Sequence, residues 1–430
     1  MYKDPVLFTE EMRKTHTILI PQMAPIHFRL LEPMLKSEGF NVEVLPDLST
    51  HVVDKGLQYV NNDACYPSIF VVGQFMEAVK SGRYDTDNLT LLMSQTGGAC
   101  RASNYVGFIR KALKDAGYGH IPVLGASLQG IERHPGFQMS KTQIVRLGKK
   151  AVQNMLYGDL IMRLSNATRP YEVEAGESKA LADQWLEKLN AKDRRYSRKE
   201  FRENVRSMIA DFTAVETRDE VRPKVGIVGE ILVKYLPEAN NHVQRQLEAE
   251  GAEVVVPDLT DFMIYSFKNA KIKENRYGTS KMGSFMAEIM IRYVESYRRV
   301  IRDALKNSPY DAPETVETLM AYAEEFVDLG NQYGEGWLLT AEMVELIRAG
   351  AGNIVCVQPF GCLPNHITGK GVIKSVREAY PTANIIPIDY DASASAVNQT
   401  NRIKLMMAQA EKNKFINHDM AKEHKKVASH

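Results

Sequence analysis

A strand–helix–strand pattern that occurs twice most constrains how this chain can fold. The apolar run 17–21 is followed by a helical pattern over 26–38 and a second apolar run over 41–45. The same order of patterns returns over 222–256. A helix between two apolar runs is the usual connection between neighbouring parallel strands. The repetition therefore predicts two units, each built on a parallel sheet.

Further strand-like runs extend both units. The runs 89–93 and 121–124 follow the first pattern, and the runs 353–357 and 384–389 follow the second. We therefore expect an α/β protein with two Rossmann-like or flavodoxin-like parallel-sheet domains. The first loop, PQMAP, lacks the glycine-rich fingerprint of dinucleotide-binding proteins.

The segment between the two units is rich in Lys, Arg and Glu and has a helical pattern. It contains no catalytic pattern, and its charge run is typical of a solvated helix face. We expect an N-terminal α/β domain over 1–138, a helical connecting region over 139–221 and a C-terminal α/β domain over 222–430.

Composition excludes several classes of function. The 430 residues are 44% hydrophobic and 25% charged, which is ordinary for a globular protein. A net charge of +1 gives no general attraction to nucleic acid or to an anionic membrane. There is no apolar run of about 18 residues, and the N-terminal residues lack the apolar core of a signal peptide. We expect a cytoplasmic protein that binds neither nucleic acid nor membrane.

The four cysteines carry the strongest chemical signal. Cys65, Cys100 and Cys362 lie in loop-like sequences, NNDACYPS, QTGGACRAS and QPFGCLPNH, whereas Cys356 lies inside an apolar run. Their spacing matches neither a zinc finger nor a ferredoxin. A lone cysteine is often only a small buried apolar residue. Three of these four sit in Gly- or Pro-containing loops, which favours metal ligands; for Cys356 a core position and a fourth ligand both stay open.

Three other residues near these loops are weaker candidates. Arg101 follows Cys100 and could hold an anionic cluster or substrate, or form a surface salt bridge. His366 follows the Cys362 loop and could donate a proton, or serve as a polar residue at a helix entry. Glu230 ends a strand, where a carboxylate can act in catalysis or cap the next helix.

Several motifs in combination resemble the 2-hydroxyacyl-CoA dehydratase superfamily: NNDACYP, TGGACR, VGIVGEI, GEGWLLTAEM, QPFGCLPNHITGKG, IDYDASAS and NRIKLM. More closely, they are similar to the cysteine-containing region of large acyl-CoA dehydratase activase-related proteins. In those proteins this region lies C-terminal to ATPase modules of the actin/Hsp70 type. This chain contains neither those modules nor a Walker A motif.

The resemblance implies an iron–sulfur protein. It implies a [4Fe–4S] cluster held by Cys65, Cys100 and Cys362, with Cys356 as the candidate fourth ligand. It also implies a partner, an ATPase activator of the actin/Hsp70-like type with its own iron–sulfur cluster, which supplies an electron at low potential. The implied reaction reduces or dehydrates a small or CoA-linked substrate. A homodimer and a paired subunit both stay open.

The role of Cys356 separates two of the remaining interpretations. Four thiolates saturate a single [4Fe–4S] cluster, as expected for a non-catalytic electron relay. Three thiolates leave one iron open to substrate, as expected for an enzyme. A third interpretation is a metal-free α/β binding protein whose cysteines belong to the core.

Overall fold

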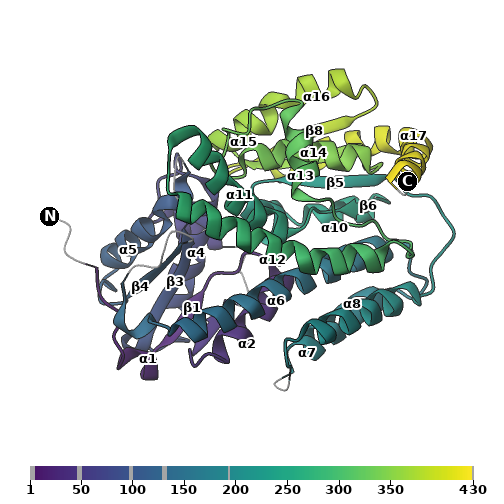
Figure 1. The fold of residues 1–430 in the computed structure, drawn as a ribbon. Coiled ribbons are helices and arrows are strands. Elements are labelled where there is room, and N and C mark those ends of the chain that lie inside the picture. The colour runs from purple at the N-terminus through teal and green to yellow at the C-terminus, as the bar shows by residue number, and fades with distance from the viewer. Residues whose placement is uncertain (1–4, 46–50, 96–99, 128–132, 192–193, 429–430) are drawn as a thin grey trace.

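Two four-stranded parallel sheets form the framework of the protein (Figure 1). The computed structural model describes residues 5–45, 51–95, 100–127, 133–191 and 194–428. The first sheet contains β1 (Thr17–Ile20), β2 (Val42–Val44), β3 (Leu89–Gln95) and β4 (Val123–Ser127). The second contains β5 (Lys224–Gly229), β6 (Glu253–Val255), β7 (Asn353–Pro359) and β8 (Asn384–Tyr390). The predicted α/β fold with two parallel-sheet domains is confirmed.

The two sheets share one strand order, β2-β1-β3-β4 and β6-β5-β7-β8. In each sheet the second strand in chain order pairs with one edge of the first strand, and the third strand pairs with its other edge. This creates a switch point between β1 and β3, and another between β5 and β7. Ligands of open α/β sheets bind outside the carboxyl ends of the strands at such points. Cys100, Glu230 and Cys362 follow β3, β5 and β7 at these ends.

Strand β7 shows how the sequence selects a central strand. All seven of its residues are buried, as expected for a parallel strand covered on both faces. Because side chains alternate along a strand, Ile354 and Cys356 join one apolar cluster while Val355 and Val357 join another. The alternation directs Cys356 into the core of the second sheet.

Helices cover both faces of the first sheet. They are α1 (Met12–Thr15), α2 (Pro25–Lys36), α3 (Val52–Leu57), α4 (Tyr66–Lys80) and α5 (Tyr105–Asp115). Residues of α4 and α5 share a core with Leu91 and Val123, whereas Met34 of α2 packs with Ile18 on the opposite face. The apolar faces of these helices thus cover both faces of the first sheet.

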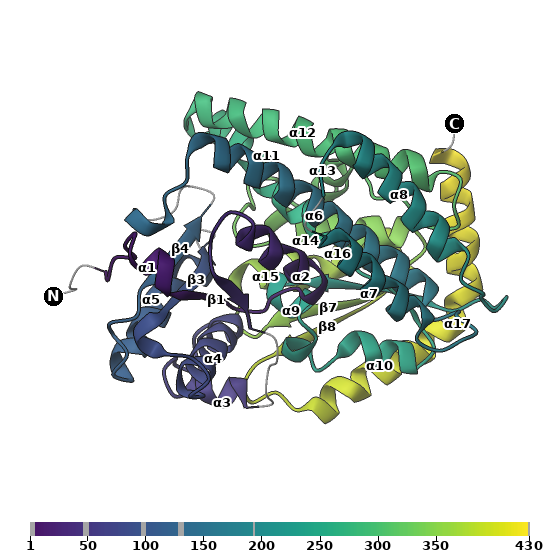
Figure 2. The ribbon, with the colours of Figure 1, turned by 90° about the horizontal axis from the view of Figure 1, so that it is seen from below.

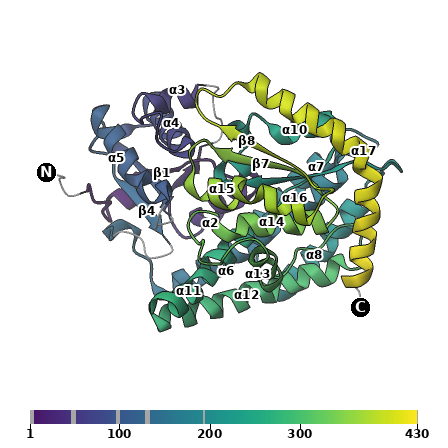
Figure 3. The same ribbon diagram turned by 90° about the horizontal axis from the view of Figure 1, so that it is seen from above.

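The second sheet is covered in the same way. Its helices are α9 (Ile231–Tyr235), α10 (Val243–Ala249), α14 (Gly336–Arg348), α15 (Leu363–Thr368), α16 (Ile373–Ala379) and α17 (Ala396–Ala428). Helices α14 and α16 cover the face that carries Cys356, and α10 and α17 cover the other. Figure 3 shows α17 running along one edge of the molecule. It continues to Ala428, close to the end of the chain.

A layer of long helices joins the two sheets (Figure 2). It consists of α6 (Lys141–Thr168), α7 (Glu177–Leu189), α8 (Arg198–Thr213), α11 (Leu259–Tyr277), α12 (Lys281–Leu305) and α13 (Val316–Glu324). Their apolar faces share one core, so helices from the connecting region and from the C-terminal half pack together. In the described part of the chain, none of the helices has the length and apolar character needed to cross a membrane.

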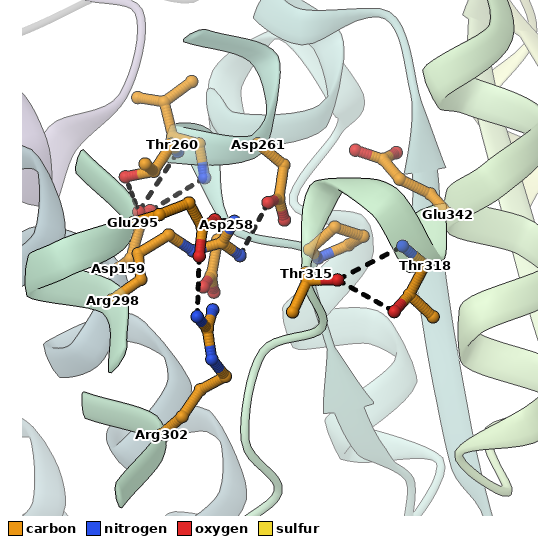
Figure 4. Close-up of polar contacts among 12 residues, drawn as sticks. Asp159, Asp258, Thr260, Asp261, Glu295, Arg298, Arg302, Thr315, Thr318 and Glu342 are labelled. Carbon is orange, nitrogen blue, oxygen red and sulfur yellow. Dashed lines mark hydrogen bonds and ion pairs between the residues drawn. The ribbon is translucent and has the colours of Figure 1, made fainter. Parts of the chain in front are cut away.

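Asp159 ties the two halves of the protein together within this layer (Figure 4). Its carboxylate, on α6, accepts hydrogen bonds from the Leu259 N–H at 2.7 Å, the Thr260 N–H at 3.1 Å and the Thr260 hydroxyl. It thereby caps the N-terminus of α11 from another helix. His27 of α2 lies 2.9 Å from the same carboxylate. A β-carbon on Gly158 would lie 2.4 Å from the His27 ring, so glycine permits this close approach.

A buried ion network continues from this junction into α12 (Figure 4). Arg298 is fully buried and lies 2.7 Å from Asp261 and 3.0 Å from Glu295. Arg302 lies 2.6 Å from the other oxygen of Glu295. Buried charges are stable only when paired in this way. We interpret this network as a structural clamp between α11 and α12.

Acid is expected to weaken the contact between α2 and α6 through Glu38. The hydrogen bond from Arg146 chiefly lowers the pKa of this buried carboxyl to about 2, and Lys150 lowers it further. A carboxyl with a depressed folded-state pKa stabilises the protein above its ordinary pKa of 4.5 and loses that contribution as the pH falls towards 2. The urea midpoint of the wild type should therefore fall more steeply between about pH 5 and 3 than that of Glu38→Gln. Parallel pH curves would refute this role.

Candidate functional site

Three of the four cysteines begin helices at the carboxyl edges of the two sheets. Cys65 is the N-cap residue of α4, Cys100 precedes the 3₁₀ turn Arg101–Asn104, and Cys362 is the N-cap residue of α15. Each has an extended backbone, as N-cap residues do. The loop before Cys65 follows α3 of the first half of the chain, whereas the loop before Cys362 follows β7 of the second sheet.

Cys65 interacts electrostatically with both Cys100 and Cys362. Burial raises the pKa of the Cys65 thiol, and the charges of Glu230 and Cys100 raise it further. Burial likewise raises the pKa of the Cys362 thiol, with contributions from Glu335, Cys65 and Glu230. We group these three cysteines, which come from loops of both halves of the chain, as the thiol site: Cys65, Cys100 and Cys362.

Cys356 lies apart from the thiol site. It is fully buried in the apolar cluster between β7 and the helices α14 and α16. A β-carbon on Gly369 would lie 3.4 Å from its sulfur, so α15 and its following turn also cover it. Burial raises the pKa of the Cys356 thiol to about 12, and Asp389, Glu342 and Glu335 add to this. Of the four predicted ligand candidates, Cys65 interacts electrostatically with Cys100 and Cys362, and Cys356 lies in the apolar core of the second sheet.

The weaker candidates Arg101 and His366 flank the thiol site. Arg101 is exposed on the turn after Cys100. His366 is half-buried in the last turn of α15, with Nδ1 2.9 Å from the Cys362 carbonyl oxygen. This bond holds the ring against its own helix. His366 therefore lies inside a short helix and not at a helix entry, and its role as a proton donor stays a prediction.

Glu230 belongs to a pair of buried carboxyl groups beside the cysteines. It caps α9 by accepting a hydrogen bond from the Val233 N–H at 2.8 Å. Burial raises its pKa well above the usual range, and repulsion from Glu335 adds to the shift. Burial also raises the pKa of Glu335. Two buried carboxyl groups that repel each other hold a proton more tightly than isolated ones do, so the pair can store a proton near neutral pH.

Glu335, the second member of this pair, also contacts Asn365, three residues after Cys362. It accepts hydrogen bonds from the Ile231 N–H at 3.0 Å and from Asn365 Nδ2 at 2.6 Å. Sequence reasoning did not select Glu335, although it lies in the quoted motif GEGWLLTAEM. Glu230 was a candidate because it ends a predicted strand. Glu335 lies between two glycines, in a stretch without the periodicity of a helix or a strand.

Tyr265 of α11 also faces this region and was not predicted. A β-carbon on Gly336 would lie 2.3 Å from its hydroxyl, which places that hydroxyl against the start of α14. Burial raises the pKa of Tyr265; nearby Asn269 lowers it, and the charges of Glu335 and Cys100 raise it further. Within the described residues its oxygen has no hydrogen-bond partner of good geometry. A buried hydroxyl without a partner is available to a ligand or water.

Comparison with known proteins adds no identification. No protein-family model matches the chain, and no curated protein matches it. Among the described residues, no group of three or more His, Cys, Asp or Glu side chains is arranged to hold a single metal ion. The candidate site therefore consists of three half-buried cysteines and the buried carboxyl groups of Glu230 and Glu335.

Proposed function

We propose that this protein is an iron–sulfur protein of the 2-hydroxyacyl-CoA dehydratase type. It receives low-potential electrons from a separate ATPase activator and reduces or dehydrates a small or CoA-linked substrate in the cytoplasm. The observation that supports the proposal is the electrostatic interaction of Cys65 with both Cys100 and Cys362, which lie on loops from both halves of the chain.

The donor chemistry of the thiol site fits a [4Fe–4S] cluster. Iron–sulfur clusters are held by cysteine thiolates, and these can come from separate loops. Each thiolate binds a different iron, so the sulfurs lie farther apart than ligands of one ion. Buried thiols with raised pKa values favour the neutral form until a cation compensates the charge, and cluster binding would then release their protons.

The thiol site contributes three thiols rather than four, which supports a catalyst over a relay. Cys65, Cys100 and Cys362 would hold the cluster, and Cys356 lies in the core. A bound cluster supplies one-electron transfer and, with three thiolates, an iron open to substrate. The carboxyl pair Glu230 and Glu335 can hold a proton beside that iron, and the Tyr265 hydroxyl can donate a hydrogen bond to a bound oxygen atom.

Electron paramagnetic resonance of the reduced protein tests this function. The chain is purified without oxygen, reconstituted with iron and sulfide, reduced with dithionite and measured before and after adding cyanide. Cyanide binds iron that lacks a thiolate ligand, so the account expects a reduced-cluster signal that cyanide changes. A signal that ignores cyanide would favour an electron relay with four protein ligands. No signal would leave the metal-free binding protein.

A further inference from the structure

Two polar side chains contact sulfurs of the thiol site, and the function proposed above does not use them. The hydroxyl oxygen of Tyr105 lies 3.9 Å from Cys65 Sγ. The side-chain nitrogen of Asn365 lies 3.4 Å from Cys362 Sγ. Tyr105 begins α5 of the first domain and Asn365 belongs to α15 of the second, so each sheet supplies one contact.

The surroundings of Tyr105 make its hydroxyl a donor toward Cys65. Tyr105 is buried in the core shared by α4 and α5, which fixes the direction of the ring. A phenol keeps its proton at neutral pH and can donate it in a hydrogen bond. A thiolate sulfur has no proton to give. When Cys65 is deprotonated, the hydroxyl must therefore be the donor.

The surroundings of Asn365 likewise orient its side-chain amide so that an N–H group points toward Cys362 Sγ. Asn365 is fully buried, and its nitrogen also lies 2.6 Å from Glu335 Oε2. An amide nitrogen carries two N–H groups and can donate one to the carboxyl and one to the sulfur. In the opposite orientation the amide oxygen would face Glu335 Oε2 and could accept a hydrogen bond there only from the protonated carboxyl. In its carboxylate form, Glu335 therefore directs the amide N–H groups to itself and to Cys362.

We infer that Tyr105 and Asn365 are positioning residues whose hydrogen bonds to the sulfurs of Cys65 and Cys362 raise the reduction potential of the cluster. The inference rests on the proposed function. Hydrogen bonds to charged groups are stronger than neutral ones, and reduction adds negative charge that spreads onto the sulfurs. The two donors therefore stabilise the reduced state more than the oxidised state, and hydrogen bonds to sulfur are an established control of cluster potential.

This arrangement suits a buried acceptor of electrons. The buried carboxyl of Glu335 contacts Asn365, the residue that also contacts Cys362, and its charge opposes additional negative charge at the thiol site. The donors offset that cost from within the protein, without an exposed cation. They also act on sulfurs from two domains, so the potential depends on both sheets being in place.

A redox titration of single variants tests the inference. Tyr105→Phe removes only a hydroxyl, Asn365→Ala removes the amide, and Tyr66→Phe is the matched control. Tyr66 is also buried and follows Cys65 directly, and among the described contacts its hydroxyl reaches no cysteine sulfur. The midpoint potential is measured by paramagnetic resonance on anaerobically reconstituted protein with equal iron content.

Each donor variant is expected to disfavour reduction by about tenfold, which corresponds to a potential about 59 mV more negative for one electron. Tyr66→Phe should keep the wild-type potential. Wild-type potentials in both Tyr105→Phe and Asn365→Ala, with clusters present, would overturn this inference and leave the proposed function standing. A wild-type protein that binds no cluster would overturn both.

Discussion

Replacing Cys65, Cys100 or Cys362 by alanine is expected to remove most of the iron that the protein retains through anaerobic purification. Each change deletes one of the three sulfurs that would hold the cluster. Loss of an outer-shell residue already weakens metal binding by about 10- to 100-fold, and loss of a ligand should cost at least as much. Iron per chain, measured with acid-labile sulfide on each variant, checks the expectation.

Cys356→Ala is the matched control for these variants. It removes the same thiol from the apolar core between β7 and α14, away from the thiol site. It should retain the iron of the wild type and lose some stability, because it leaves a small cavity. Wild-type iron in the variants of Cys65, Cys100 and Cys362 would contradict the ligand assignment. Loss of iron in Cys356→Ala from a folded chain would instead make Cys356 the fourth ligand.

Asp159→Ala is expected to lower the free energy of unfolding by about 3–5 kcal/mol. Burial raises the pKa of Asp159, but hydrogen bonds from His27 and Thr260 outweigh this and keep the net pKa below its ordinary value. Removing the carboxylate leaves His27 and the first N–H groups of α11 buried without their acceptor. Urea unfolding followed by circular dichroism measures the loss.

Asp183→Ala provides the comparison for an exposed aspartate. Asp183 pairs with Arg29 at 2.5 Å, and about a third of its side chain and half of that of Arg29 are exposed. Exposed ion pairs contribute about 0–1 kcal/mol, so this variant should unfold close to the wild type. Equal losses for the two aspartate variants would show that Asp159 does not link the halves of the protein.

The strands were predictable because parallel strands buried on both faces require continuous apolar runs. The runs over 17–21, 89–93 and 353–357 correspond to β1, β3 and β7. Helix α11 carried no such signal. Its sequence, LTDFMIYSFKNAKIKENRY, mixes aromatic and charged residues, because one face packs in the helical layer while others meet buried ion pairs. Only the tertiary partners of α11, Asp159 among them, explain its start.

The thiol site was predictable only in part. The loop positions of Cys65, Cys100 and Cys362 marked them, because strand ends of parallel sheets gather their loops at one edge. The sequence predicts that alternate residues of the strand 353–357 face opposite sides of the sheet. It does not predict which side Cys356 faces, because the packing of the helices decides that. Tyr105 and Tyr265 gave no signal, since aromatic residues at helical spacing are usually core residues.

Iron and acid-labile sulfide per chain, determined on protein purified without oxygen, test the central claim most directly. The account predicts about four irons and four sulfides per chain, as a single [4Fe–4S] cluster requires. No iron and no sulfide, even after reconstitution, would contradict it, and the cysteines of the thiol site would then be structural residues of an α/β binding protein.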